Sequence, residues 1–210
     1  NILKSFDGNV VGITGSNGKT TTTKIIANVL SKSSSTLKNY NNEIGMPLSI
    51  FYAKQNSNNL VIEMGAAKPG DIKYLSSILK PNIGVITNIG NSHLEKLKNI
   101  KGVLEVKSEL VSNIKNGGYL VVPNENKEHL KFWKKIIRGK ELITFGTEKN
   151  ADFYAINIKS SIKKQEFNII SDKYNLDHKI KTSLSGVHNI KNILAAFAVS
   201  YLIENSPKLF

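Results

Sequence analysis

The residues best suited to chemistry form the segment Thr-Gly-Ser-Asn-Gly-Lys-Thr at residues 14–20. It follows an apolar run at residues 10–13 and precedes a stretch with helical spacing, which is the strand–loop–helix setting of a phosphate-binding loop. Glycines let the backbone fold around phosphate oxygens, and amides at the helix start point at them. Lys19 adds a mobile positive charge, and the Thr20 hydroxyl is suited to bind Mg²⁺. The segment predicts nucleoside triphosphate binding, although Ile13 replaces a glycine of the longer G-x-x-x-x-G-K-[ST] form.

Two further candidates follow later apolar runs. Glu63 lies near the end of the run at residues 60–64, and His93 follows the run at residues 83–86 and a polar loop. In open α/β sheets ligands bind beyond the carboxyl ends of the strands, so ligating groups are expected at such positions. The Glu63 carboxylate could hold Mg²⁺ directly or through water, or be an incidental strand-end residue. His93 could also ligate a metal, although a lone histidine is more often structural and Mg²⁺ prefers oxygen.

Lys107 stands on the apolar stripe of a predicted helix at residues 102–114. It lies four residues after Val103 and three before Leu110, which is the spacing of one helix face. A lysine on such a face either extends its ammonium outward to solvent or takes part in chemistry. The spacing by itself favours the outward orientation.

The elements that must position these residues can be read from hydrophobic spacing. Buried strands are expected at residues 10–13, 60–64, 83–86 and 119–122. Helices are expected between them at residues 21–30, 46–53, 71–79 and 102–114. The alternation predicts an α/β fold of the P-loop type, with a mostly parallel sheet and helices on both faces. From about residue 151 to 184 apolar and polar residues alternate, which predicts a small antiparallel strand group, and a final helix is expected at residues 189–203.

The amino-acid composition and net charge limit the classes of protein to which this chain can belong. The 210 residues are 40% hydrophobic, enough for one main domain, and they contain no cysteine, which excludes disulfides and thiolate chemistry. The net charge of +13 suits a nucleic-acid partner, but Arg138 is the only arginine, whereas base readout favours the guanidinium group. We therefore expect a lysine-rich solvated surface and no nucleic acid. Without a signal peptide or a bilayer-spanning run, we expect a piece of a soluble cytoplasmic protein, without membrane insertion.

Taken together, the motifs resemble those of the Mur ligase family, in its central ATP-binding domain, and most closely its MurF type. The resemblance covers nearly the whole chain and rests on six segments in the family's order, at residues 14–20, 41–47, 61–66, 87–95, 106–109 and 186–192. It implies one central domain over residues 1–210, with the antiparallel part at about 151–184. The family's N-terminal UDP-binding domain and its C-terminal domain are expected to be absent from these residues.

The resemblance also implies roles for the residues that match the family's motifs. Thr20, Glu63 and His93 would bind magnesium, and Lys107 would be the family's carbamylated lysine, an anionic group that bridges metal ions. The expected catalytic residues are Lys19, His93 and Lys107. The expected nucleotide contacts are Gly15, Ser16, Asn17, Gly18, Lys19, Thr20, Thr21, His188, Asn189 and Asn192. The expected contacts to the muramyl peptide are Asn41, Asn42 and Asn88.

The reaction that the resemblance implies is amide formation driven by ATP and Mg²⁺. The γ-phosphoryl group would pass to a peptide carboxylate, and an amine would attack the resulting acyl phosphate. In the MurF type the acceptor is UDP-N-acetylmuramoyl-tripeptide and the amine is that of D-alanyl-D-alanine. We expect a monomer that does not ligate without the other domains. One departure is Val187, which stands where the family often has arginine, so that one phosphate or nucleotide contact is missing.

Two alternatives stay open within the nucleotide-binding class. One is another Mur ligase or a ligase of the folylpolyglutamate type, and the other is a different P-loop phosphotransferase. A GTPase is disfavoured because the Asn126-Lys127 pair is followed by Glu128-His129 and not by the x-Asp that would recognise guanine.

Overall fold

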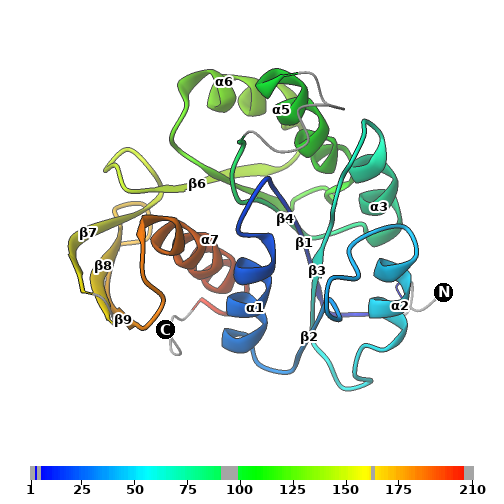
Figure 1. Ribbon diagram of the computed structural model, residues 1–210, viewed down its shortest axis with the longest axis horizontal. Helices are drawn as coiled ribbons and strands as arrows, with labels where there is room; N and C mark the ends of the chain where they lie inside the picture. Colours follow the sequence, from blue (N-terminus) through cyan, green and yellow to red (C-terminus); the bar gives the residue numbers. More distant parts are fainter. Residues whose placement is uncertain (1–2, 4–5, 91–98, 162–163, 206–210) are drawn as a thin grey trace.

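A single sheet of nine strands runs through the computed structural model, which describes residues 3, 6–90, 99–161 and 164–205 (Figure 1). The strands are β1 (Asn9–Thr14), β2 (Ser33–Ser35), β3 (Asn59–Glu63), β4 (Ile83–Ile86), β5 (Tyr119–Pro123), β6 (Glu141–Gly146), β7 (Phe153–Ser160), β8 (Gln165–Ser171) and β9 (Leu176–Thr182). Their order in the sheet is β2-β3-β1-β4-β5-β6-β7-β8-β9. The pairs from β2 to β7 are parallel, and the last two pairs are antiparallel. The predicted α/β fold is therefore confirmed.

Helices cover both faces of the sheet. On one face lie α1 (Lys19–Val29) and α7 (Val187–Glu204), which run side by side (Figure 1). On the other face lie α2 (Gly45–Phe51), α3 (Asp71–Leu79), α5 (Ile100–Ser108) and α6 (Lys127–Ile136), together with the 3₁₀ helix η2 (Glu109–Asn113). Successive strand residues point to opposite faces, so Val11 packs beneath α1 and α7 while Val10 packs on the other side. Within the described residues, every helix is too short or too polar to cross a bilayer.

The parallel register brings the ends of the central strands to one edge of the sheet. Ile13 of β1 is the register partner of Glu63 at the end of β3, and Thr14 is the partner of Ile86 at the end of β4. Because parallel strands share one direction, the loops that follow all three strands meet at this edge. The framework therefore gathers the predicted phosphate loop, Glu63 and the segment after β4.

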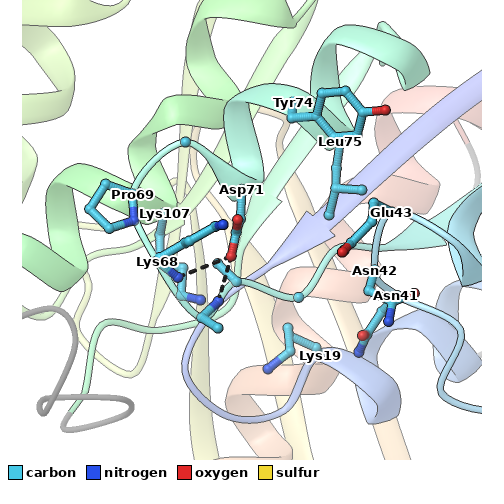
Figure 2. Close-up of a pocket in the computed structure, with 14 residues that line it drawn as sticks. Lys19, Asn41, Asn42, Glu43, Lys68, Pro69, Asp71, Tyr74, Leu75 and Lys107 are labelled. Carbon is cyan, nitrogen blue, oxygen red and sulfur yellow. Dashed lines mark hydrogen bonds between the residues drawn. The ribbon is translucent and has the colours of Figure 1, made fainter.

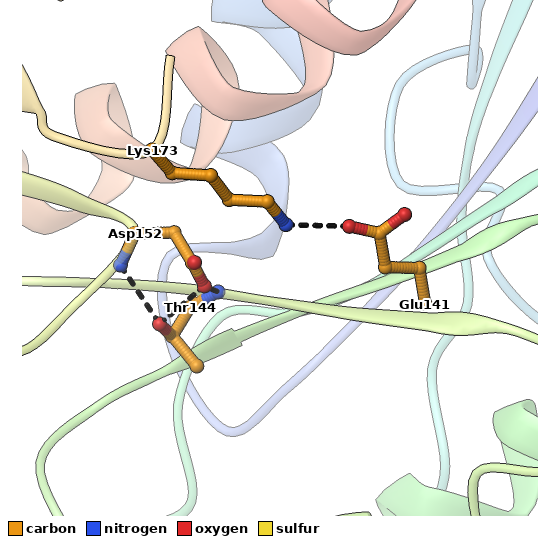
Figure 3. Close-up of polar contacts among 4 residues, drawn as sticks. All are labelled: Glu141, Thr144, Asp152 and Lys173. Carbon is orange, nitrogen blue, oxygen red and sulfur yellow. Dashed lines mark hydrogen bonds and ion pairs between the residues drawn. The ribbon is translucent and has the colours of Figure 1, made fainter. Parts of the chain in front are cut away.

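The antiparallel strands extend the main sheet instead of forming a separate unit. β7 pairs in parallel with β6 at Phe145 and Phe153, and β8 and β9 then add in antiparallel order, as the alternating sequence predicted. Polar contacts support this junction (Figure 3). One Asp152 carboxylate oxygen accepts hydrogen bonds from the Thr144 backbone N–H and hydroxyl, each at 2.7 Å. Lys173, in the turn between β8 and β9, pairs with Glu141 of β6 at 2.5 Å.

Several elements differ from the sequence-based expectations. The helix predicted over residues 102–114 is α-helical only to Ser108 and then tightens into η2. Three elements were not predicted, namely β2, β6 and α6. A signal for α6 was present, since the Asn126 side chain caps the helix by accepting hydrogen bonds from the backbone N–H groups of Glu128 and His129. Its apolar anchor is Trp133, which is fully buried.

Candidate active site at the carboxyl edge of the sheet

The phosphate loop takes the shape that its glycines allow. After β1, Gly15 and Gly18 have positive φ angles of 144° and 78°, and α1 starts at Lys19 directly after Gly18. An L-residue would be strained at either position. A Cβ atom on Gly18 would also lie 2.3 Å from Oδ1 of Asn192, so this glycine lets α7 approach the loop. The loop thus presents the start of α1, whose first N–H groups have no partner within the helix, at the edge of the sheet.

Lys19 lies over the loop that precedes it. Its Nζ donates to the carbonyl oxygens of Gly15, at 3.0 Å, and Ser16, at 3.2 Å. Burial lowers the pKa of the Lys19 ammonium, and the Glu63 carboxylate opposes that shift. A cation held over backbone carbonyls in this way is well placed to contact anionic oxygens that bind at the helix start.

Glu63 is held by neighbours on both of its carboxylate oxygens. The Thr20 hydroxyl donates to Oε2 at 2.7 Å, and the Asn41 side-chain amide donates to Oε1 at 2.7 Å. Glu63 is only 3% exposed. The carboxylate is therefore fixed beside the Thr20 hydroxyl, and the two residues present oxygen donors of the kind that Mg²⁺ prefers.

Lys107 is buried, so the outward orientation that its spacing favoured is wrong. Its exposure is 1%, and its side chain lines a cavity that Lys19 and Asp71 also line, instead of extending over the outer surface. Burial and then the positive charge of Lys19 lower the pKa of Lys107 to about 8, against the opposing effect of Asp71 and Glu109. Next to it, the Ser108 hydroxyl accepts a 2.8 Å hydrogen bond from the Trp133 indole, which ties this turn to α6.

A cavity of about 840 Å³ lies between Lys19 and Lys107 (Figure 2). We call it the lysine cavity, because Lys19, Lys68 and Lys107 line it together with Asn41, Asn42, Asp71 and other residues. Asp71 shapes its rim by accepting hydrogen bonds from the backbone N–H groups of Ala67, at 2.8 Å, and Lys68, at 3.0 Å. The three ammonium groups suit an anionic ligand, such as a carboxylate or a phosphoryl group.

A second cavity, of about 630 Å³, lies on the other side of the phosphate loop, and we call it the asparagine cavity. Its lining includes Asn17, Gly18, Thr21, Asn88, His188, Asn189 and Asn192. It combines the phosphate loop with the first turns of α7, so it can take a ligand that extends from the loop towards α7. Lys191 and Glu125 form an ion pair of 2.5 Å among its lining residues.

Most of the residues predicted from the sequence therefore meet around the phosphate loop. Asn41 and Asn42 line the lysine cavity, as do Lys19 and Lys107, while His188, Asn189 and Asn192 line the asparagine cavity. Asn88 lies in the asparagine cavity and not with Asn41 and Asn42. His93 lies outside the described residues.

Sequence reasoning did not single out several residues that the structure adds to the site. They are Asp71, Thr87, Lys68 and the Glu125–Lys191 pair. Asp71 had a local signal, since an acidic residue directly after Gly70 is typical of the first turn of a helix, where the helix dipole favours negative charge. The others have no local signal, because their roles depend on contacts with distant segments.

Comparison with known proteins gives a consistent result. Residues 13–200 match the model of the Mur ligase middle domain. The UDP-N-acetylmuramoyl-tripeptide–D-alanyl-D-alanine ligase of Buchnera aphidicola subsp. Acyrthosiphon pisum is 36% identical over 210 residues, which cover 97% of this chain and 45% of that protein. MurF from Acinetobacter baumannii has a similar structure, with a TM-score of 0.89 at 25% identity over 98% of this chain and 45% of that one. MurF from Thermotoga maritima in complex with ADP gives 0.85 at 29% identity, over 96% and 47% of the two chains. The chain thus spans less than half the length of these relatives.

Proposed function

We propose, from the premise that this chain belongs to the Mur ligase family, that it is the ATP-binding middle domain of a ligase that joins D-alanyl-D-alanine to UDP-N-acetylmuramoyl-tripeptide. Relatives of that name match nearly the whole chain at 31–36% identity. Their greater length means that the remaining parts of such an enzyme lie outside the matched region. The complete reaction, its two substrates and its place in peptidoglycan synthesis therefore belong to the proposal.

The observation that carries the proposal is the position of the phosphate loop between two cavities. Asn17, Gly18 and Thr21 line the asparagine cavity, and Lys19 lines the lysine cavity. A nucleotide bound in the asparagine cavity, next to His188 and Asn189, would run its phosphates across the start of α1 towards Lys19. An acceptor carboxylate in the lysine cavity, near Asn41 and Asn42, would then face the terminal phosphate. This is the juxtaposition that phosphoryl transfer to a carboxylate requires.

Mg²⁺ fits the donors that the structure supplies. Thr20 and Glu63 are neighbouring oxygen donors, and Glu63 is nearly buried. Among the described residues there is no group of three acidic or imidazole side chains that could hold an ion alone, so the phosphate oxygens would have to complete the coordination, as is usual for Mg²⁺. Bound Mg²⁺ would supply charge neutralisation for these oxygens. The assignment of a second ion to His93 rests on the family resemblance.

Lys107 is suited to the carbamylation that the family resemblance implies. Only the neutral amine reacts with CO₂, in a step that forms a carbamate and releases one proton. Burial and the charge of Lys19 lower the pKa of Lys107 to about 8, so more of the neutral amine is present near neutral pH than for an ordinary lysine. The product would be an anion beside a cavity lined by Lys19 and Lys68. The modification would thus replace a repelled cation with a paired anion that can bind metal.

The chain's own residues then have definite parts in the reaction. Lys19 would contact the oxygens of the transferred γ-phosphoryl group and offset their negative charge. The product of that transfer is an acyl phosphate and ADP, and attack by the amine of D-alanyl-D-alanine would give the amide and inorganic phosphate. Asn41 would hold Glu63 in place through its 2.7 Å hydrogen bond. We propose that the enzyme is cytoplasmic and that it acts as a monomer.

Calorimetric titration of the chain with ADP and Mg²⁺ tests the nucleotide site, with GDP as the comparison ligand. We expect ADP to bind more tightly than GDP and the affinity to depend on Mg²⁺. We expect no amide product when the chain alone is given ATP, muramyl tripeptide and D-alanyl-D-alanine. The decisive structure is a complex with an ATP analogue and Mg²⁺. The proposed site is wrong if Glu63 and Lys107 point away from the triphosphate in it.

A further inference from the structure

The segment that follows β4 is packed directly against the phosphate loop. The Thr87 backbone N–H donates to the Thr14 carbonyl at 3.0 Å, and the Ser16 N–H donates to the Asn88 carbonyl at 3.2 Å. A Cβ atom on Gly15 would lie only 2.0 Å from the Thr87 hydroxyl oxygen. Glycine at position 15 therefore allows the two backbones to lie in contact, and the conformation of one constrains the other.

The side chain of Asn88 brackets a single residue of that loop. Its Oδ1 accepts from the Asn17 backbone N–H at 2.9 Å, and its Nδ2 donates to the Asn17 carbonyl at 3.0 Å. The Thr87 hydroxyl donates to the same carbonyl at 2.6 Å. These bonds hold the peptide groups on both sides of Asn17, so they fix both of its backbone dihedral angles.

We call these hydrogen bonds from Asn88 and Thr87 to the Asn17 backbone the bracket, and they determine where the neighbouring backbone groups point. In a planar trans peptide the C=O and N–H groups point in opposite directions, and all the peptide bonds of the described residues are trans. Because the Asn17 carbonyl points at Thr87 and Asn88, the Gly18 N–H points away from them. By the same geometry the Ser16 carbonyl points away from Asn88, and there it accepts from Lys19 Nζ at 3.2 Å. The bracket thus turns the Gly18 N–H towards the side on which the Lys19 ammonium lies.

We propose that Asn88, assisted by Thr87, is a positioning residue that presets the phosphate loop for the nucleotide phosphates. The inference rests on the proposed ATP-binding function and deepens it. It gives Asn88 a different role from the peptide contact that the family resemblance implied. Asn88 and Thr87 line the asparagine cavity, whereas Asn41 and Asn42 line the lysine cavity. A loop that already has its bound conformation does not have to be ordered when phosphate binds. The binding free energy is therefore not reduced by the cost of ordering the loop.

The bracket requires a carboxamide. Aspartate at position 88 would keep an acceptor for the Asn17 N–H but would set a second carboxylate oxygen against the Asn17 carbonyl. Leucine, which has nearly the same shape, would leave both groups without this partner. Asn88→Leu therefore removes the bracket with little change in volume, and Thr87→Val removes the assisting hydroxyl in the same way.

The test compares the affinities of the variants for Mg²⁺–ADP, by calorimetry, with their affinities for adenosine, by ligand-observed NMR. For Asn88→Leu we expect about a tenfold loss of ADP affinity, the effect of one or two lost hydrogen bonds, and unchanged adenosine affinity. Thr87→Val should lose less, and Thr87→Ser, which restores the hydroxyl, should recover most of that loss. The matched control is Asn168→Leu, which removes a carboxamide bonded to Asp177 far along the sheet.

The outcomes separate this inference from the proposed function on which it rests. If the unchanged chain does not bind Mg²⁺–ADP, the proposed function fails. If it binds, but Asn88→Leu binds ADP equally well, the positioning role is overturned. An equal loss of ADP and adenosine affinity would also overturn it, because that result indicates general disruption. If Asn88→Leu does not fold, the comparison of Thr87→Val with Thr87→Ser decides, and equal ADP affinities of these two variants would overturn the role.

Discussion

The two ends of the sheet use polar side chains in different ways. At the carboxyl edge of the parallel strands, Glu63, Thr87 and Lys107 are all less than 5% exposed. At the antiparallel end, the side chains of Lys173 and Glu141 pair while they are 39% and 49% exposed. Burial of a charged or polar group is unfavourable unless hydrogen bonds or an opposite charge compensate for the lost water. An exposed ion pair stays hydrated, so it changes the stability of the fold only a little.

The difference in burial indicates that the parallel edge forms the candidate binding site and that the antiparallel end supports it. The buried groups of the parallel edge converge on the phosphate loop and two cavities, and one of them, Lys107, is a cation held where burial opposes its charge. The antiparallel strands instead pack Phe153 and Phe167 into the core beneath α7, whose first turns line the asparagine cavity. We therefore expect substitutions at the parallel edge to change ligand binding, and those at the antiparallel end to change stability alone.

The largest effect is expected for Lys19→Ala. Removal of the ammonium that lies over the phosphate loop should weaken Mg²⁺–ADP binding about a hundredfold, which corresponds to about 2.7 kcal/mol. Calorimetric titration measures the change. The control is Lys24→Ala, which removes an exposed lysine from the same helix. If the two variants bound Mg²⁺–ADP with equal affinity, the phosphates would not bind next to Lys19.

Lys107→Met should stabilise the protein at pH 7, by about 1–3 kcal/mol, because the buried ammonium is unfavourable in the folded state. The folded-state pKa of Lys107 is about 8 and its ordinary value is 10.5. Between these values the unfolded state binds more protons, so the stability of the unchanged protein should rise with pH and the advantage of the variant should disappear above pH 10.5.

Urea unfolding in CO₂-free buffer at several pH values measures this advantage. Lys101→Met, which changes an exposed lysine of the same helix, is the control and should have little effect at any pH. A destabilised Lys107→Met variant at pH 7 would mean that the buried ammonium is compensated by its surroundings.

At the antiparallel end, Asp152→Ala should destabilise the fold by about 1 kcal/mol, because the Thr144 N–H and hydroxyl lose their common acceptor. Urea unfolding measures the loss, and Asp177→Ala, which removes an exposed acceptor of one bond, should cost less. Affinity for Mg²⁺–ADP should not change. A clear fall in that affinity would contradict the expectation that substitutions at the antiparallel end change stability alone.

The smallest effect is expected for the exposed pair of Lys173 and Glu141 (Figure 3). In a double-mutant cycle with Lys173→Met and Glu141→Gln, the coupling free energy should be about 0.5 kcal/mol or less and should decrease with salt. Urea unfolding of the four proteins gives this value. A coupling above about 1 kcal/mol would show that the junction depends on this pair more than its exposure implies.

Features that depend on a short stretch of chain could be predicted from the sequence. The phosphate loop, the four central strands and the antiparallel texture after residue 151 were all placed correctly from local patterns. The direction of parallel strands then put Glu63 beside the loop, because all such strands end at one edge. The helix α6 could have been found in the same way, from its Asn126 cap and amphipathic spacing.

Side-chain contacts between distant segments were decided only by the tertiary structure. Spacing put Lys107 on the inner face of its helix, but its 1% exposure depends on how α3 and η2 pack against α5. Asn41 meets Glu63 across 22 residues of sequence, and Asn88 brackets Asn17 across 71. The sequence alone indicated that the phosphate loop and Glu63 lie at one edge of the sheet, because alternating strands and helices imply parallel strands that end together. Which side chains touch at this edge depends on how the loops between the strands pack together, and no local pattern contains that information.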